Sequence, residues 1–107
     1  MTDRQNTQTD DYRLLNVMVD GKPVEFIRAT ITRCITWTGG PGSRVRELRW
    51  YGEFVSTTFQ PEVDETVSVH DLVGETTDGC LVEGYFTISS RHGQGFDVIG
   101  SGELTIG

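Results

Sequence analysis

The sequence predicts an all-β fold, either a small antiparallel β-sandwich or a partly closed β-barrel of about six to seven strands. Three observations support this class. Glycine is abundant, with 13 residues against 3 prolines, and short turn-forming segments separate the longer runs. Valine, isoleucine and threonine recur, which suits strands. The run Phe96–Ile106 alternates in polarity with a period of two, as a strand with one buried face does.

The N-terminal part divides at residue 12. Residues 1–11 are polar and charged, and they predict a disordered N-terminal arm, followed by a single domain over residues 12–107. The first predicted strand is Tyr12–Val19. Asp20-Gly21 then forms a two-residue turn of type I′, and Pro23 opens the next strand.

Two long strands are predicted in the middle of the chain. Residues 24–38 form the first, in which Arg33 interrupts an apolar face and indicates either a bulge or an edge that reaches water. A glycine-rich loop over residues 38–43 leads into the second strand, residues 44–59, with a bulge at Gly52.

The C-terminal half is expected to end in a hairpin. Before it, residues 60–65 turn a corner, residues 66–69 form a short strand and residues 74–79 form a loop, although residues 63–73 are also compatible with one helical turn. The hairpin strands are residues 80–90 and 96–106, joined by a polar loop with two glycines. One face of the last strand is expected to carry Phe96, Val98, Gly100, Gly102, Leu104 and Ile106.

Charge is unevenly distributed along the chain, whose formal net charge is −7. Most of the basic residues fall in residues 13–50, whereas residues 51–107 are acidic with Arg91 as their single basic residue. Either neighbouring strands neutralise each other, or the surface is bipolar and copies of the chain meet head to tail.

The sequence predicts a cytoplasmic protein without cofactor or metal. No apolar run approaches the roughly 20 residues of a membrane helix, and residues 1–11 lack the apolar core of a signal peptide. Cys34 and Cys80 are expected to be free thiols, since they show no zinc-ligand spacing. The acids between residues 64 and 78 lack the spacing of a calcium loop.

No catalytic motif is present, so we predict that the chain is not an enzyme. His70 and Asp71 are neighbours on a strand and point to opposite faces, which prevents a catalytic relay between them. Folding could still bring the two histidines and carboxylates together, which keeps an enzyme as a third hypothesis. A partner or ligand surface is predicted where basic and aromatic residues meet and at the hairpin loop, namely at Arg44, Arg46, Arg49, Trp50, Tyr51, Arg91 and His92.

These observations favour a non-enzymatic structural or protein-interaction module. In fold class alone it resembles small all-β subunits of phage particles and of bacterial injection machines, which implies a self-assembling subunit of such an assembly. The expected partner is a protein or another copy of the chain. Two alternatives stay open: a small-ligand-binding barrel with Trp37, Trp50, Tyr51 or Phe54 at its mouth, and a single-stranded nucleic-acid binder, which the acidic pI of about 4.6 disfavours.

Overall fold

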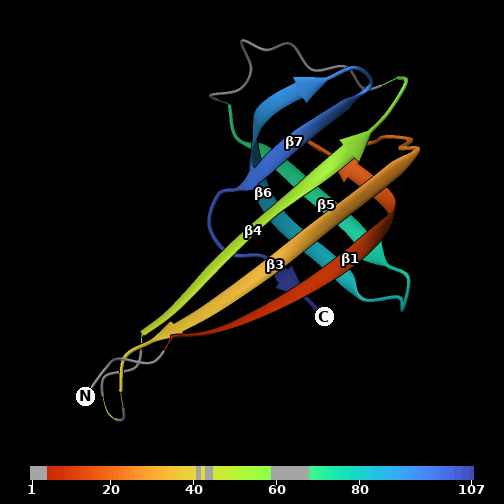
Figure 1. Cartoon of the computed structure of the whole chain (residues 1–107). Helices are drawn as coiled ribbons and strands as arrows, with labels where there is room; N and C mark the ends of the chain where they lie inside the picture. The colour runs from red at the N-terminus through yellow and green to blue at the C-terminus, as the bar shows by residue number, and fades with distance from the viewer. Residues whose placement is uncertain (1–4, 41, 43–44, 59–67) are drawn as a thin grey trace.

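The computed structural model describes residues 5–40, 42, 45–58 and 68–107, and in this part the chain forms strands and no helix. All strand pairs are antiparallel, which confirms the predicted all-β antiparallel class (Figure 1). The eight strands are β1 (Gln5–Val19), β2 (Lys22–Pro23), β3 (Arg28–Thr38), β4 (Val45–Val55), β5 (His70–Thr76), β6 (Leu81–His92), β7 (Gly95–Gly100) and β8 (Thr105–Ile106).

The strands form one sheet that closes partly into a ring. Their order is β2-β1-β3-β4-β7-β6-β5, and β1 also pairs with β5, so the first part of the sheet meets the last. The arrangement therefore corresponds to the partly closed form of the predicted fold rather than to two separate sheets. None of the described residues belongs to a helix with the length and apolarity that a membrane crossing requires.

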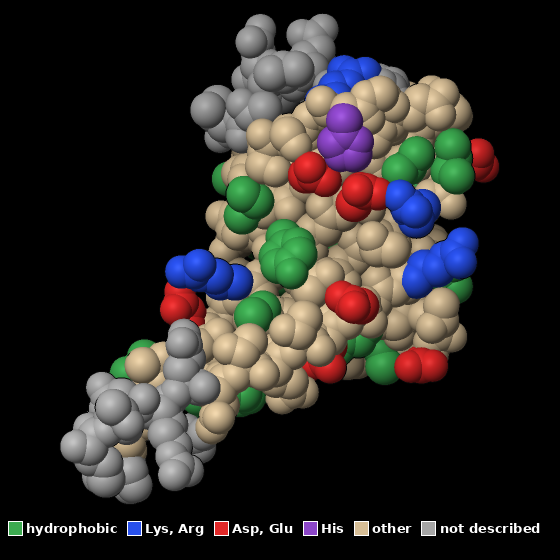
Figure 2. All heavy atoms as spheres, viewed as in Figure 1, with side chains coloured by type: hydrophobic (Ala, Val, Ile, Leu, Met, Phe, Trp, Pro, Cys, Tyr) green, Lys and Arg blue, Asp and Glu red, His purple; other side chains and the backbone are tan. Residues whose placement is uncertain are grey.

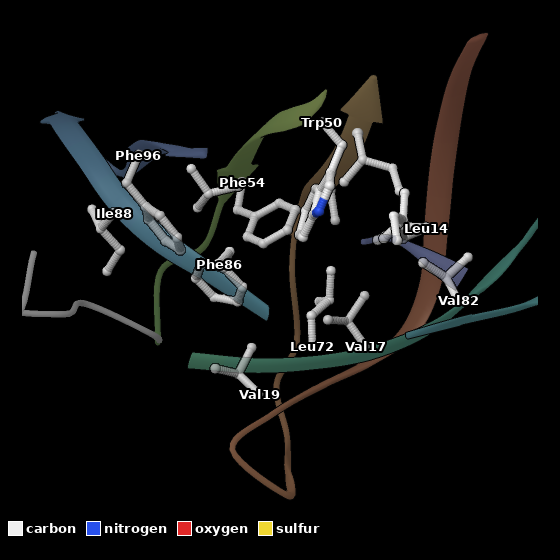
Figure 3. Packing of buried hydrophobic residues seen from close by; sticks show 14 residues of the cluster. Leu14, Val17, Val19, Trp50, Phe54, Leu72, Val82, Phe86, Ile88 and Phe96 are labelled. Carbon is white, nitrogen blue, oxygen red and sulfur yellow. The ribbon is translucent and has the colours of Figure 1, made fainter. Parts of the chain in front are cut away.

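The core fills the ring and is rich in aromatic side chains. Phe54 is fully buried and lies edge-on to Phe86 and Phe96, each with its ring centroid at 5.7 Å (Figure 3). Aromatic pairs favour this edge-to-face geometry because the positive ring edge meets the negative ring face. Trp50 is 2% exposed and closes one side of the same cluster.

One predicted turn and part of one predicted strand face are confirmed. Asp20 and Gly21 both have positive φ, 54° and 78°, and they connect Val19 directly to Lys22 across the hairpin. In the C-terminal hairpin, Phe96, Val98 and Leu104 are buried as expected. However, the predicted strand over residues 96–106 is interrupted after Gly100, and its end forms the separate β8 against β6.

The predicted disordered arm over residues 1–11 is wrong for residues 5–11. These residues continue β1 and pair in register with β3, from Gln5 opposite Thr38 to Asp11 opposite Thr32. Their polar composition reflects exposure on both faces rather than disorder, because backbone pairing with β3 does not depend on burial. Residues 1–4 lie outside the described part.

The predicted bulge at Gly52 is also wrong, since β3 and β4 stay in register from Arg28 opposite Val55 to Thr38 opposite Val45. The same register excludes a bulge at Arg33, which leaves the second of the two predicted alternatives, a face that reaches water. Gly52 has a steric role instead: an added Cβ would lie 2.5 Å from the carbonyl oxygen of Thr30. The register shifts lie elsewhere, between Leu15 and Met18 in β1 and at Ser89 in β6.

The region before β5 differs from the prediction as well. Ser68 and Val69 are not in a strand, β5 begins at His70, and residues 74–76 belong to β5 rather than to a loop. The predicted corner at residues 60–65 lies outside the described residues. The alternative helical turn over residues 63–73 is wrong for residues 68–73, since these form no helix and β5 begins at His70. Cys34 and Cys80 are free thiols, as predicted.

Candidate functional site

A three-stranded ribbon projects from the ring and is its most distinctive feature. It consists of Gln5–Arg13 of β1, Thr30–Thr38 of β3 and Val45–Trp50 of β4, with β3 in the centre (Figure 1). β5 pairs with β1 only from Leu14 onward, and β7 pairs with β4 only from Tyr51 onward. Among the described residues, both lateral edges of the ribbon are therefore unpaired along their length.

Local features at both edges explain why the ribbon leaves the ring. On the β1 side, β5 ends at Thr76, opposite Leu14, and a turn in which the amide of Thr76 donates to the carbonyl of Cys80 leads into β6. On the β4 side, the indole of Trp50 lies so close to Gly100 that a Cβ there would overlap its ring. After Ile99, the chain turns away from β4, and the amide of Ser101 donates to the carbonyl of Tyr85.

The two faces of the ribbon differ in character. The outer face carries a row of small polar residues, in which Thr32 donates a 2.7 Å hydrogen bond to Asp11 and Thr7 lies 3.4 Å from Thr36, measured between the side-chain oxygens. The inner face continues the core with Ile35, which is buried, and Leu48, which is half-buried. The ribbon thus has a polar outer face and an inner face with one apolar patch.

Arg33 lies on this inner face and is tied to its neighbours on β1. Its guanidinium donates a 3.0 Å hydrogen bond to the hydroxyl of Tyr12, lies 5.6 Å from the centre of that ring and is 3.7 Å from the carboxylate of Asp10. These contacts explain why a charged residue is accepted where the sequence pattern predicts an apolar one.

Charge distinguishes the two edges of the ribbon. The β1 edge carries Asp10 and Asp11, on opposite faces, because successive strand residues alternate. The β4 edge carries Arg46 and Arg49, again on opposite faces, and Glu47, which accepts a 2.9 Å hydrogen bond from Arg49. One edge is acidic and the other is net basic.

The structure divides the predicted basic and aromatic surface between two faces. Arg46 and Trp50 share the inner parity, and Arg49 and Tyr51 share the outer one. Because Trp50 is buried in the core, its ring is not available for stacking on a nucleic-acid base. Arg44 lies outside the described residues.

Beside the β4 edge lies an open groove of about 690 Å³. It forms where β7 ends and β4 continues, and its apolar outer rim is made by Tyr51 and Ile99, which are each about half exposed. The groove also reaches Gly102 and Glu103.

His92 and Arg91 lie at the other end of the molecule, in the β6–β7 hairpin. Ile88 faces the core opposite Val98, and simple alternation would turn His92 inward as well. Instead, Ser89 is an extra residue in β6, so that Ser90 pairs with Asp97 and faces outward. This bulge reverses the parity and places His92 on the outer face, whereas Arg91 takes the opposite parity.

On that face His92 joins two carboxylates that the sequence did not indicate. Its Nε2 atom lies 3.2 Å from Asp97 Oδ1, and Ser90 donates a 2.8 Å hydrogen bond to Asp97 Oδ2. These contacts, first Ser90 and then His92, hold the pKa of Asp97 below its usual value. Glu53 on β4 is directly opposite Asp97 and forms an ion pair with Arg28.

We call Glu53, His92 and Asp97 the histidine–carboxylate cluster. One ligand-type atom from each residue lies within 4.8 Å of the others. Figure 2 shows acidic side chains and a histidine gathered over the end of the sheet formed by β4, β6 and β7. Sequence reasoning missed Glu53 and Asp97 because it could not supply the register that sets them opposite each other.

His70 is buried and does not belong to the histidine–carboxylate cluster. It is 8% exposed, stacks on Phe86 with ring centroids 5.4 Å apart, and its Nδ1 lies 2.9 Å from Asp20 Oδ2. The backbone amide of Asp71 also donates a hydrogen bond to the Asp20 carboxylate. Hydrogen bonds from His70 and Asp71 therefore connect the first turn to β5. The hydrogen bond with His70, followed by that from Asp71, lowers the pKa of Asp20.

Comparisons with protein-family models, with curated proteins and with solved structures found no match to this chain.

Proposed function

We propose that the chain is a non-enzymatic structural subunit that assembles with copies of itself through the edges of the ribbon. The observation that carries this proposal is that both edges are unpaired within the described part of the chain and carry opposite net charge. An unpaired edge presents a row of backbone donors and acceptors that another strand can satisfy.

The β1 edge lacks several of the usual devices against such pairing, and the charged residues that it carries are Asp10, Asp11 and Arg13. Over Gln5–Arg13 it contains no proline or lysine, and its register with β3 has no bulge. Natural proteins use these devices to prevent edge-to-edge association. At about 3.3 Å per residue, the nine register pairs of this segment extend over roughly 30 Å.

Strand directions determine the form of the assembly. β1 and β4 are both antiparallel to β3, so they run parallel to each other. A second copy in the same orientation therefore brings its β4 edge alongside the β1 edge of the first as a parallel pair. This contact is head to tail, so it generates a closed ring of subunits or a filament.

Charge favours the same pairing over its alternatives. In a β1-to-β4 contact, Asp11 of one copy and Arg49 of the next lie on the outer face of the joined sheet. Asp10 and Arg46 lie on its inner face. Pairing β1 with β1 would instead bring aspartates together, which costs stability. As part of this proposal, the subunit is made in the cytoplasm and enters a larger phage-like or bacterial multiprotein particle.

The test is a charge exchange between the two edges. We choose Asp11→Lys and Arg49→Glu, because both side chains are exposed on the outer face and Asp10 stays in place beside Arg33. Native mass spectrometry and sedimentation should show a defined oligomer for the original chain, weakened between about 50 and 500 mM salt as charge contacts are screened.

Each single variant should shift the population toward monomer, whereas D11K/R49E should restore the oligomer. An equimolar mixture of the D11K and R49E chains should also recover it, with the two chains alternating. Glu83→Lys is the matched control, since it makes the same charge change on exposed β6 surface outside the ribbon. A monomer at every concentration, or failure of the double variant to recover, contradicts the proposal.

The groove beside Tyr51 and Ile99 is the place where the alternative function, binding of a small ligand, would act. Of the aromatic residues expected at a cavity mouth, Trp50 and Phe54 are buried in the core. A monomer that carries a constant extra mass in the same spectra would favour the ligand-binding function over assembly.

A further inference from the structure

We propose that the histidine–carboxylate cluster of Glu53, His92 and Asp97 is a binding site for a divalent transition-metal ion of the zinc type. This site is independent of the ribbon and of its edges. It would use one imidazole nitrogen and one oxygen from each of two carboxylates as ligands.

The distances are close to those that a zinc ion requires. With zinc–ligand bonds of about 2.0–2.1 Å, tetrahedral geometry separates ligand atoms by roughly 3.3–3.4 Å. His92 Nε2 and Asp97 Oδ1 are already 3.2 Å apart, and all three ligand atoms lie within 4.8 Å of one another. Glu53 has to bring its oxygen closer to the other two ligand atoms to complete the set.

The backbone brings these residues together from three strands. Glu53 on β4 and Asp97 on β7 are register partners, and the bulge at Ser89 turns His92 of β6 to the same face. Without that extra residue His92 would point into the ring. Positions on paired strands hold ligands more firmly than positions on loops.

Neighbouring groups orient the ligands and leave one oxygen of each carboxylate available. Ser90 donates to Asp97 Oδ2, so Oδ1 faces His92. Arg28 contacts Glu53 Oε1, which leaves Oε2 for an ion. The imidazole lies against the backbone of Gly95, where an added Cβ would be 3.1 Å from its Cε1 atom. Such outer contacts fix the orientation of metal ligands.

The donor set selects the class of ion. Magnesium and calcium prefer oxygen ligands alone, whereas zinc accepts mixed nitrogen and oxygen ligands. Three protein ligands leave one tetrahedral position for water or for a group from another molecule.

Isothermal titration calorimetry with zinc chloride tests the site, on full-length protein without an affinity tag. One zinc ion should bind per chain, and magnesium chloride should give no binding. His92→Ala, Asp97→Asn and Glu53→Gln should each weaken zinc binding at least about tenfold, the lower end of the effect of losing even an outer contact. These side chains are at least a third exposed, so the unfolding midpoint without zinc should show that the variants still fold.

Two controls separate this site from other zinc ligands on the chain. Glu83→Gln removes an exposed carboxylate elsewhere on β6 and should leave zinc affinity unchanged. The double variant C34S/C80S removes both thiols and should also retain binding. The proposal is overturned if the original chain binds no zinc, if H92A or E53Q binds as tightly as the original chain, or if the cysteine variant loses binding.

Discussion

The ring and the ribbon are built partly from the same strands, yet they are stabilised in different ways. β1, β3 and β4 run through both regions without losing register between β3 and β4. In the ring, their inner face meets β5, β6 and β7 and buries the aromatic core. In the ribbon, no described strand covers that face. Backbone pairing alone thus extends a sheet, whereas closure of the sheet is what creates a core.

Trp50 marks the boundary between these regions. It is the last residue of β4 before the pairing with β7 begins, and its ring contributes to the core. Beyond it, the inner face of β4 offers only Leu48 and Arg46, which are half-buried and exposed. We therefore expect that truncating a fully buried side chain of the ring costs far more free energy of unfolding than truncating a half-buried side chain of the ribbon.

The largest effect is expected from Phe54→Ala in the ring. Phe54 is fully buried against Phe26, Phe86 and Phe96, so its removal leaves a cavity. The free energy of unfolding, measured by urea denaturation, should fall by about 3–5 kcal/mol. In the ribbon, Thr36→Ala should change it by no more than about 0.5 kcal/mol. Equal losses would mean that the ribbon is as tightly packed as the ring.

Gly100→Ala should test the boundary itself. The added methyl group would overlap the indole of Trp50, and we expect a loss of about 1–3 kcal/mol in the free energy of unfolding. Gly40→Ala is the control, because a Cβ there meets open space. The cost at Gly100 should shrink in a Trp50→Leu background. If Gly100→Ala lowers the free energy of unfolding as much in the Trp50→Leu background, the loss does not come from overlap with the indole of Trp50.

The bulge in β1 between Leu15 and Met18 should be sensitive to the residue at position 16. Asn16 has a positive φ, where a side chain with a Cβ costs about 1–2 kcal/mol. Asn16→Ala and Asn16→Gly both remove the side-chain contact with Glu75, so their difference isolates the backbone term. The glycine variant should be at least as stable as the alanine variant in thermal unfolding. A clearly more stable alanine variant would indicate that the bulge is not required.

The smallest effect is expected from loss of the hydrogen bond between Asp20 and His70. The folded-state pKa of Asp20 is below its ordinary value of 3.8, so its contribution to stability is present above about pH 4 and is lost as pH falls through the lowered folded-state pKa. Asp20→Asn should therefore be less stable than the original chain at neutral pH, and the difference should vanish in acid. Because the carboxylate is half exposed, the effect is small.

Urea midpoints between about pH 2 and 7 measure this difference, across the range in which aspartates titrate. Asp78→Asn, in an exposed turn, is the control for the loss of one carboxylate. A difference between D20N and the original chain that grows in acid would contradict the assignment.

The sequence predicted those parts of the fold that depend on neighbouring residues. The turn at Asp20-Gly21 follows from two residues that tolerate positive φ, and the buried positions of β7 follow from alternation. The ribbon could not be predicted in this way. Residues 5–11 have no apolar face, and their strand structure depends on β3, which lies more than 20 residues later in the chain.

The candidate sites show the same limit. His92 was identified from its position in a hairpin, but its partners depend on the β4–β7 register and on a bulge at Ser89. The pair Ser89-Ser90 carries no sequence signal for an extra residue. Trp50 was interpreted as a surface aromatic because basic residues precede it, whereas its buried position is set by the closure of the ring.

The orientation of the strands in the ribbon also has a mechanical consequence. A force that pulls the tip away from the ring acts along the strands, so the β1–β3 and β3–β4 hydrogen bonds resist in shear and share the load. A force across the ribbon would peel one edge and break those bonds one after another. The ribbon should therefore bear tension along its axis and yield to lateral peeling.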